Sequence, residues 1–131
     1  MTSRLLKGFV LITSDCDEQL LLSISFNQPV KIHSLRFISK DSGPRTFSTF
    51  VNQHAMSFDD TESLPAIDEI EIPRDMPLVG LKFVKYQFVH SLTIFVKDNQ
   101  NDSDVTDIQQ LILYGCPIES TKDLKYILLN F

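Results

Sequence analysis

Alternation of apolar and polar side chains with a period of two is the feature that most constrains the fold of this chain. It is clearest over residues 20–27, where four apolar side chains alternate with mostly polar ones: Leu20, Leu22, Ile24 and Phe26 against Leu21, Ser23, Ser25 and Asn27. Successive side chains of a strand point to opposite faces of a sheet, so this pattern predicts a strand with one buried face. Until the C-terminal residues, no window shows a sustained helical period.

A change of phase near His33 and Ser34 predicts an irregularity in the strand that follows. Val30 and Ile32 occupy even positions, whereas Leu35 and Phe37 occupy odd ones. One extra residue in a strand, a β-bulge, re-aims all the side chains after it. The pattern predicts further strands at Phe47–Val51, Ile70–Ile72, Leu78–Lys85, Ser91–Lys97 and Ile108–Tyr114, and the N-terminal segment is expected to lead into a first strand.

Turn residues rich in Asp, Asn, Ser, Gly and Pro separate these segments. About seven short strands with turns every ten or so residues favour an all-β antiparallel sandwich or jelly roll. Near the end, Leu124, Ile127, Leu128 and Phe131 recur at helical spacing after a possible capping sequence, Ser120-Thr-Lys-Asp123. We therefore expect a short C-terminal helix. The length of 131 residues, with no linker-like stretch, predicts a single domain over residues 1–131.

The distribution of charge bears on possible partners. Twelve Lys and Arg against seventeen Asp and Glu give a net charge of −5, which disfavours nucleic-acid binding. The longest apolar runs are only four residues, as in Phe9–Ile12, so no membrane-spanning helix is expected. Acids dominate residues 59–75, which could attract a basic partner surface or could simply be a solvated loop face.

Motifs for catalysis are missing from the sequence. His33, His54 and His90 lie in separate segments without metal-ligand spacing, and the isolated glycines form no phosphate-binding loop. Cys16 and Cys116 form no CxxC pair and are expected to be reduced thiols, with a disulfide as the minority alternative. We expect no enzyme, no catalytic residues, no metal and no cofactor. A calcium site in the loop 98–104 stays open, although the segment departs from the EF-hand pattern.

Five ordered motifs resemble one known family, the PITH domain, over about residues 14–121. They are Ser14-Asp-Cys-Asp-Glu-Gln-Leu-Leu21, Phe26-Asn-Gln-Pro-Val-Lys-Ile-His-Ser-Leu35, Phe50-Val-Asn-Gln53, Met56-Ser-Phe-Asp-Asp-Thr-Glu62 and the stretch Leu81–Ile108. The resemblance implies a galactose-binding-like jelly roll. It also implies a non-catalytic module that docks a protein onto the proteasome regulatory particle in the cytoplasm and nucleus. Such modules occur alone or as the C-terminal part of thioredoxin-like proteins, and we expect a monomer.

The polar residues of these motifs are the candidate partner-binding residues, because binding residues tend to lie on loops of a rigid scaffold. They are Asn52, Gln53, Asp59, Asp60, Glu62, Gln87, Asp98, Asn99 and Gln100. Turn formation by Asp and Asn side chains is the alternative explanation for them. The aromatic residues Phe26, Phe50, Phe83 and Phe95 are predicted to lie in the core. The alternative function is a small-ligand or carbohydrate-binding jelly roll, by analogy with the fold alone.

Overall fold

The computed structural model describes residues 8–14, 18–53, 55–118 and 125–131. In this part of the chain the elements are strands β1 (Gly8–Ser14), β2 (Leu20–Ile38), β3 (Thr46–Val51), β4 (Asp68–Glu71), β5 (Leu78–Gly80), β6 (Val89–Val96), β7 (Gln110–Pro117) and β8 (Lys125–Asn130), with the short helix α1 (Asp60–Ser63) and the 3-10 turn η1 (Phe83–Lys85). The predicted all-β antiparallel sandwich is confirmed. No helix among the described residues has the length and apolar character needed to cross a membrane.

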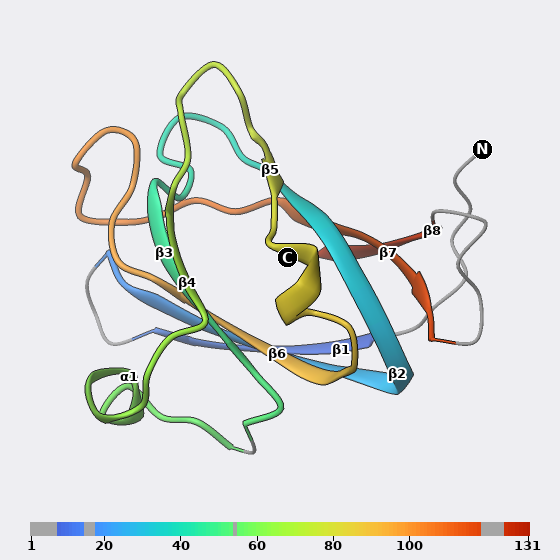
Figure 1. The fold of residues 1–131 in the computed structure, drawn as a ribbon. Helices are drawn as coiled ribbons and strands as arrows, with labels where there is room; N and C mark the ends of the chain where they lie inside the picture. Colours follow the sequence, from blue (N-terminus) through green and yellow to red (C-terminus); the bar gives the residue numbers. More distant parts are fainter. Residues whose placement is uncertain (1–7, 15–17, 54, 119–124) are drawn as a thin grey trace.

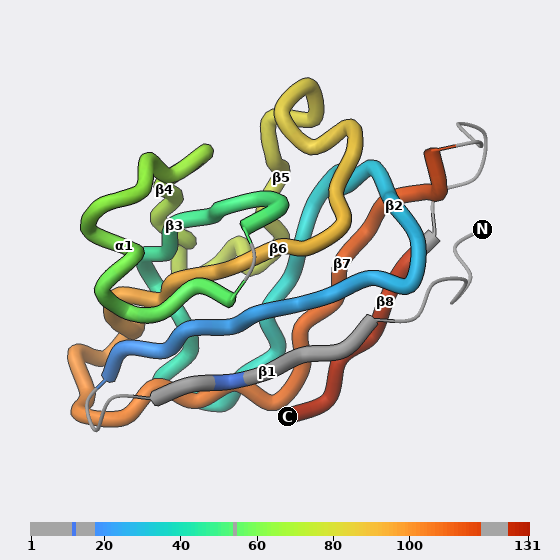
Figure 2. Tube along the Cα trace, turned by 90° about the horizontal axis from the view of Figure 1, so that it is seen from below, coloured from blue at the N-terminus to red at the C-terminus, as the bar shows by residue number. Residues whose placement is uncertain are grey.

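The long strand β2 belongs to both layers of the sandwich (Figures 1 and 2). Its N-terminal half, Leu20–Ser25, pairs with β1 and β6, and β6 pairs onward with β3 and then β4. Its C-terminal half, Val30–Ile38, pairs with β7 and β5, and β7 pairs with β8. All these pairings are antiparallel, and the core lies between the two halves of the molecule.

The predicted bulge in β2 is confirmed. The register between β2 and β7 shifts between Ile32 and Ser34, so His33 is the extra residue. Gly115 lies opposite Ile32, and a Cβ atom there would meet the carbonyl oxygen of Lys31 at 2.0 Å. The bulged backbone therefore approaches β7 too closely for any side chain at residue 115.

The predicted C-terminal helix is wrong, because residues 125–130 form β8 at the edge of the second layer. Ile127 and Leu129 are buried while their neighbours are more exposed, so the segment fits a period of two as well as a helical period. A helix this short is marginal alone, whereas β7 offers a complete ladder of backbone partners. The predicted capping sequence, Ser120-Thr-Lys-Asp123, lies outside the described residues.

The strand predicted over Leu78–Lys85 is shorter in the structure. Only Leu78–Gly80 pairs with β2, and η1 follows at Phe83–Lys85. Phe50 and Phe95 lie in the core as predicted, and Phe26 is partly buried against it. The core assignment of Phe83 is wrong, since its side chain is 39% exposed.

Candidate functional site

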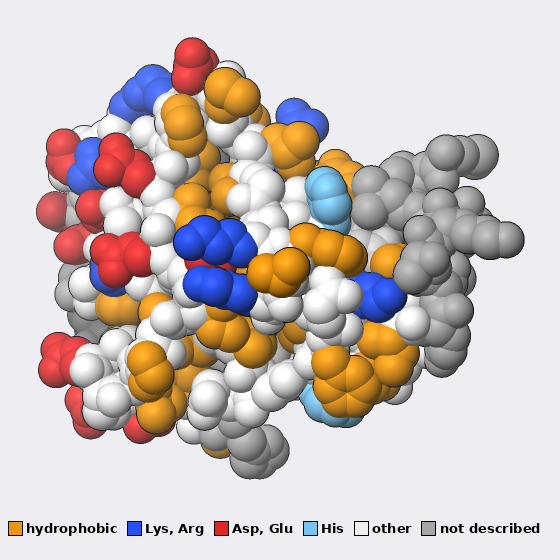
Figure 3. Space-filling view, viewed as in Figure 1, with side chains coloured by type: hydrophobic (Ala, Val, Ile, Leu, Met, Phe, Trp, Pro, Cys, Tyr) orange, Lys and Arg blue, Asp and Glu red, His pale blue; other side chains and the backbone are white. Residues whose placement is uncertain are grey.

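Four large apolar side chains lie exposed between β5 and β6. We call them the apolar strip: Leu78, Phe83, Val84 and Phe88, which are 54%, 39%, 81% and 51% exposed. Figure 3 shows hydrophobic side chains gathered over this part of the surface, with histidine and Lys or Arg side chains beside them. Single exposed apolar residues are ordinary, but a cluster that includes two phenylalanines marks a candidate contact surface.

Aromatic contacts orient the two phenylalanines of the strip. The ring of Phe83 lies 6.1 Å from the ring of His33, the bulged residue of β2. The ring of Phe88 lies edge-on to His90, at 4.7 Å between centroids. The bulge therefore has a second consequence. It turns the side chain of His33 outward, and the imidazole of His33 then supports the ring of Phe83.

The segment that carries the strip is anchored by one buried residue. Tyr86 is fully buried, and its backbone carbonyl accepts a hydrogen bond from the amide of Ile32 at 2.9 Å. The amide of Tyr86 bonds the carbonyl of Phe83 at 3.0 Å, which closes η1. Because η1 breaks the alternation of a strand, Phe83 and Val84 both face solvent while Tyr86 points inward.

The hydroxyl of Tyr86 belongs to a buried polar network. It donates a hydrogen bond of 2.6 Å to Oδ2 of Asp68, and it lies 2.6 Å from Oγ1 of Thr49. Nζ of Lys85 approaches Oδ1 of Asp68 at 3.7 Å. Burial, reinforced by the hydrogen bond to Asp68, raises the pKa of Tyr86 above its ordinary value. The network ties β3 and β4 to the segment below the strip.

Two of the predicted binding residues, Asn52 and Gln87, form hydrogen bonds to the backbone of the segment that carries the strip. Asn52 adopts a left-handed conformation with φ of 58°, donates to the carbonyl of Phe88 at 2.9 Å and accepts from the amide of His90 at 2.7 Å. The side chain of Gln87 donates to the carbonyl of Phe83 at 2.7 Å. Gln53 is exposed, and its carbonyl accepts a bond of 3.5 Å from Ser91.

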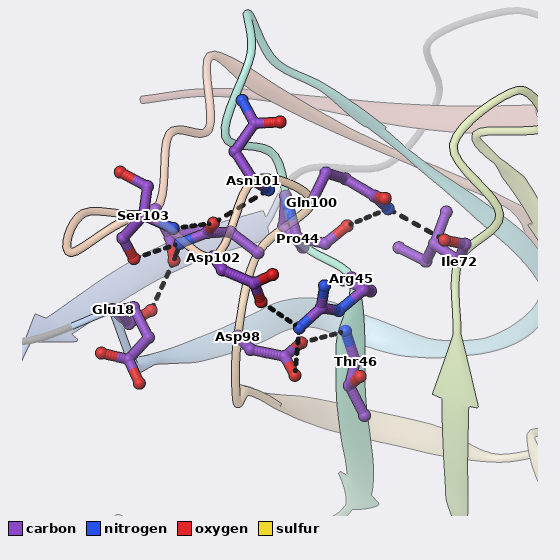
Figure 4. Close-up of polar contacts among 12 residues, drawn as sticks. Glu18, Pro44, Arg45, Thr46, Ile72, Asp98, Gln100, Asn101, Asp102 and Ser103 are labelled. Carbon is purple, nitrogen blue, oxygen red and sulfur yellow. Dashed lines mark hydrogen bonds and ion pairs between the residues drawn. The ribbon is translucent and has the colours of Figure 1, made fainter.

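The predicted residues Asp98, Asn99 and Gln100 form a second polar network at one end of the sandwich (Figure 4). Asn99 is fully buried; its amide donates to the carbonyl of Ser103 at 2.9 Å and to the hydroxyl of Thr106 at 3.2 Å. The amide of Gln100 reaches two other segments, with bonds to carbonyls of Pro44 and Ile72. These side chains hold the loop together, as the turn-forming explanation supposes.

A guanidinium group lies among the acids of this loop. Arg45 bonds Oδ2 of Asp98 at 3.1 Å and Oδ1 of Asp102 at 2.7 Å, while the amide of Thr46 bonds Asp98 at 2.9 Å. Desolvation alone would raise the pKa of Asp98, but the bonds from Arg45 and Thr46 outweigh it and lower that pKa. The guanidinium of Arg45 thus provides the positive charge beside these carboxylates, at the place where a calcium site would have a metal ion. Within the described ranges, no cluster of three metal-ligating side chains occurs.

The acidic candidates lie on another part of the surface. Asp60 begins α1 and accepts hydrogen bonds from the amide and hydroxyl of Ser57. Asp59 and Glu62 are exposed, and neither forms an ion pair with any residue that the structure describes. In Figure 3 the acidic side chains gather on the side of α1 and β4, away from the apolar strip. The sequence-predicted residues are therefore dispersed over several regions and do not form one site.

Sequence reasoning missed the apolar strip, although the segment Phe83–His90 carried a usable signal. It contains two adjacent apolar pairs, Phe83-Val84 and Phe88-Val89, which an alternating strand with one buried face does not have. Where the alternation of apolar and polar residues breaks in this way, some apolar side chains can face solvent. Of the two cysteines, Cys116 is buried, and Cys16 lies outside the described residues, as does His54.

Comparisons with known proteins agree on one family. The family model of the PITH domain matches residues 6–129. Thioredoxin-like protein 1 of Schizosaccharomyces pombe is 37% identical over 117 residues, which cover 82% of this chain and 40% of that protein. PITH domain-containing protein ZK353.9 of Caenorhabditis elegans is 37% identical over 109 residues, covering 79% of this chain and 51% of the relative.

A third relative, PITH domain-containing protein CG6153 of Drosophila melanogaster, is 30% identical over 109 residues, which cover 79% of this chain and 51% of that protein. The chain thus spans about half the length, or less, of these relatives. The family match covers nearly the whole chain, from before β1 to the last residue but one of β8. This chain belongs to the PITH domain family.

Proposed function

We propose that this chain is a protein-interaction module that docks onto the proteasome regulatory particle through the apolar strip. The observation that carries this proposal is the exposure of Leu78, Phe83, Val84 and Phe88 on a segment that is otherwise firmly held. Burial of such side chains against a partner supplies the main favourable term in association. Family membership supports the choice of partner.

The composition of the strip suits a contact surface. Two of its four residues are phenylalanines, and aromatic residues are enriched in the energetically dominant parts of interfaces. The rings of His33 and His90 lie beside those of Phe83 and Phe88, and the exposed Lys82 immediately precedes Phe83 in the chain. The positive charge of Lys82 favours a partner surface that combines apolar pockets with carboxylates.

Rigidity of the segment favours affinity. Tyr86, Asn52 and Gln87 fix the backbone carbonyls and amides of residues 83–90 by hydrogen bonds. Ordering a loop on binding costs free energy, and a loop that is already ordered avoids this cost. The polar family residues therefore contribute to binding by holding the apolar residues in place.

The remaining expectations belong to the same proposal. The chain acts without catalysis and without a cofactor, as a single monomeric domain in the cytoplasm and nucleus. The similarity to thioredoxin-like protein 1 supports the proposal that the chain functions as part of, or as a relative of, a thioredoxin-like protein.

Co-sedimentation with purified regulatory particle tests the proposal. We expect the unchanged chain to bind saturably, and the double variant Phe83→Ser, Val84→Asp to bind at least about 30-fold more weakly, as at interface hot spots. The control variant Asp59→Asn, Glu62→Gln removes two exposed acids and should bind like the unchanged chain. Loss of binding in the control alone would place the contact on the acidic surface. Absence of binding by the unchanged chain would refute docking itself.

A further inference from the structure

A cavity of about 340 Å³ opens at the end of the sandwich. It lies between the C-terminal end of β2, the loop 39–44 and the connection 72–77, and its volume falls within the usual range for small-ligand sites. Three cationic side chains line it: Arg36, Lys40 and Arg74. None of them belongs to the apolar strip or to the candidate residues predicted from the sequence.

The walls of the cavity are fixed by the loop that follows β6. The side-chain amide of Gln100 donates hydrogen bonds to carbonyls on two of the walls, at Pro44 and Ile72. Its backbone amide donates to the carbonyl of Gly43 at 2.9 Å. The amide of Lys40 bonds Oδ2 of Asp107 at 2.6 Å. The cavity is therefore preformed, and a ligand would not have to order its walls.

The charge of the cavity contrasts with that of the chain. Arg36 and Lys40 form no ion pair with any residue in the described ranges. The guanidinium of Arg74 is positioned by the carbonyl of Gln100 and by Oδ1 of Asn101, neither of which is charged. Asp41 is the one carboxylate among the lining residues, so the lining carries a formal charge of +2 in a chain of net charge −5.

We propose that this cavity binds a phosphate monoester. Such a group carries a charge of roughly −1.5 to −2 at neutral pH, which matches the lining, and arginine binds its oxygens through paired N–H donors. A ligand with a single carboxylate, of charge −1, would leave one of the two net positive charges of the lining unbalanced. The apolar lining of Ile72, Pro73 and Pro77 accepts the body of the molecule that carries the phosphate. Phe37 is the one aromatic residue of the lining, and its ring is buried edge-on against Phe47, so it offers no exposed face on which a sugar could stack.

NMR titration of the ¹⁵N-labelled chain with inorganic phosphate tests the proposal, with sodium chloride at matched ionic strength as the reference. We expect saturable shifts at amides of residues 36–44 and 72–77, with a Kd of about 1 mM, as is reasonable for so small a ligand. Arg36→Gln and Lys40→Ala should each weaken binding about tenfold, the effect of losing one charge-assisted contact. Both side chains are exposed and unpaired in the structure, so both variants should fold.

Lys82→Ala is the matched control, because it removes the same charge from an exposed position outside the cavity. It should leave phosphate binding unchanged. Shifts equal to those in chloride, equal weakening in all three variants, or no saturation by about 20 mM phosphate would overturn the proposal.

Two further titrations distinguish which kind of molecule carries the phosphate group. A phosphoserine-containing peptide and ribose 5-phosphate share the monoester but differ in the attached body. Tighter binding than inorganic phosphate by the peptide indicates a phosphorylated protein, whereas tighter binding by the sugar phosphate indicates a metabolite. Weaker binding of both than of inorganic phosphate would contradict a site for a monoester. This site is independent of the proposed docking, since Arg36 and Lys40 belong neither to the apolar strip nor to its polar neighbours.

Discussion

Replacing Tyr86 with phenylalanine removes one oxygen from the buried network that anchors the apolar strip. In the structure this hydroxyl donates to Asp68 at 2.6 Å and contacts the hydroxyl of Thr49 at the same distance. Tyr86→Phe keeps the ring and its packing. Among the residues that the structure describes, Lys85, at 3.7 Å, is then the charged partner that the carboxylate of Asp68 retains.

The expected loss of stability is about 2 kcal/mol. A hydrogen bond to a charged group contributes about 1.5–3 kcal/mol, and leaving a buried acceptor without its donor costs a similar amount. The ion pair with Lys85, whose side chain is 41% exposed, offsets a part of this cost, so the middle of the range is appropriate. Deletion of an oxygen without loss of the ring leaves almost no cavity.

Urea unfolding followed by circular dichroism measures this loss. With a slope of about 2 kcal/mol/M, the midpoint should fall by about 1 M. Tyr114→Phe is the matched control, because Tyr114 is only partly buried and its hydroxyl forms no hydrogen bond within the described residues. Equal midpoints for the two variants would refute the assignment of a stabilising role to the Tyr86 network.

The difference in stability between the unchanged chain and Tyr86→Phe is also expected to depend on pH. Burial and the bond to Asp68 raise the pKa of Tyr86 in the folded state above its unfolded value of about 10. A group with a raised pKa stabilises the fold below its unfolded pKa, and this contribution is lost as the pH rises further. The stability difference between the unchanged chain and Tyr86→Phe should therefore narrow above about pH 10. A difference that stays constant or widens there would contradict the argument.

Three further predictions concern the loop after β6 and the bulge. Asn99→Ala should lower the free energy of unfolding by at least about 2 kcal/mol in urea melts, because buried partners lose their bonds; a loss below about 0.5 kcal/mol would refute this role. Gly115→Ala should cost about 1–3 kcal/mol from its clash with backbone, whereas Gly80→Ala, with no atom within 4 Å of its added Cβ, should be near neutral; reversal of this order would contradict the packing described. Asp98→Asn should cost about 1 kcal/mol at pH 7. Because the pKa of Asp98 is lowered, this cost should disappear as the pH falls well below about 4, and a cost that persists there would exclude the ion pair with Arg45 as its cause.

Much of the sandwich follows from the sequence alone, because strands with one buried face carry a visible period of two. The bulge at His33 was predicted from a phase shift between Ile32 and Leu35, and the register confirms it. The same reasoning failed for β8, where Ile127 belongs both to the helical series with Leu124 and Leu128 and to the period-two pair with Leu129. This segment is a strand because it pairs with β7. The sequence pattern of the segment alone does not reveal that β7 lies beside it.

The site was less predictable than the fold. Asn52, Asn99 and Gln100 are polar residues of the motifs, and their side chains hold loops by bonds to backbone groups far away in the sequence. Local patterns cannot separate such a role from partner binding, because both place Asn and Gln in loops. Phe83 was assigned to the core by its residue type, and only η1 turns it outward.

The central claim is that the apolar strip contacts the proteasome regulatory particle. Site-specific photo-crosslinking tests it directly, with a photoreactive residue at Val84, which is 81% exposed within the strip, or at Val105, which is 68% exposed in the loop between β6 and β7. With purified regulatory particle, the account predicts a crosslink to one defined subunit from residue 84 and none from residue 105. A crosslink from residue 105 alone, or none from either residue under saturating conditions, would contradict it.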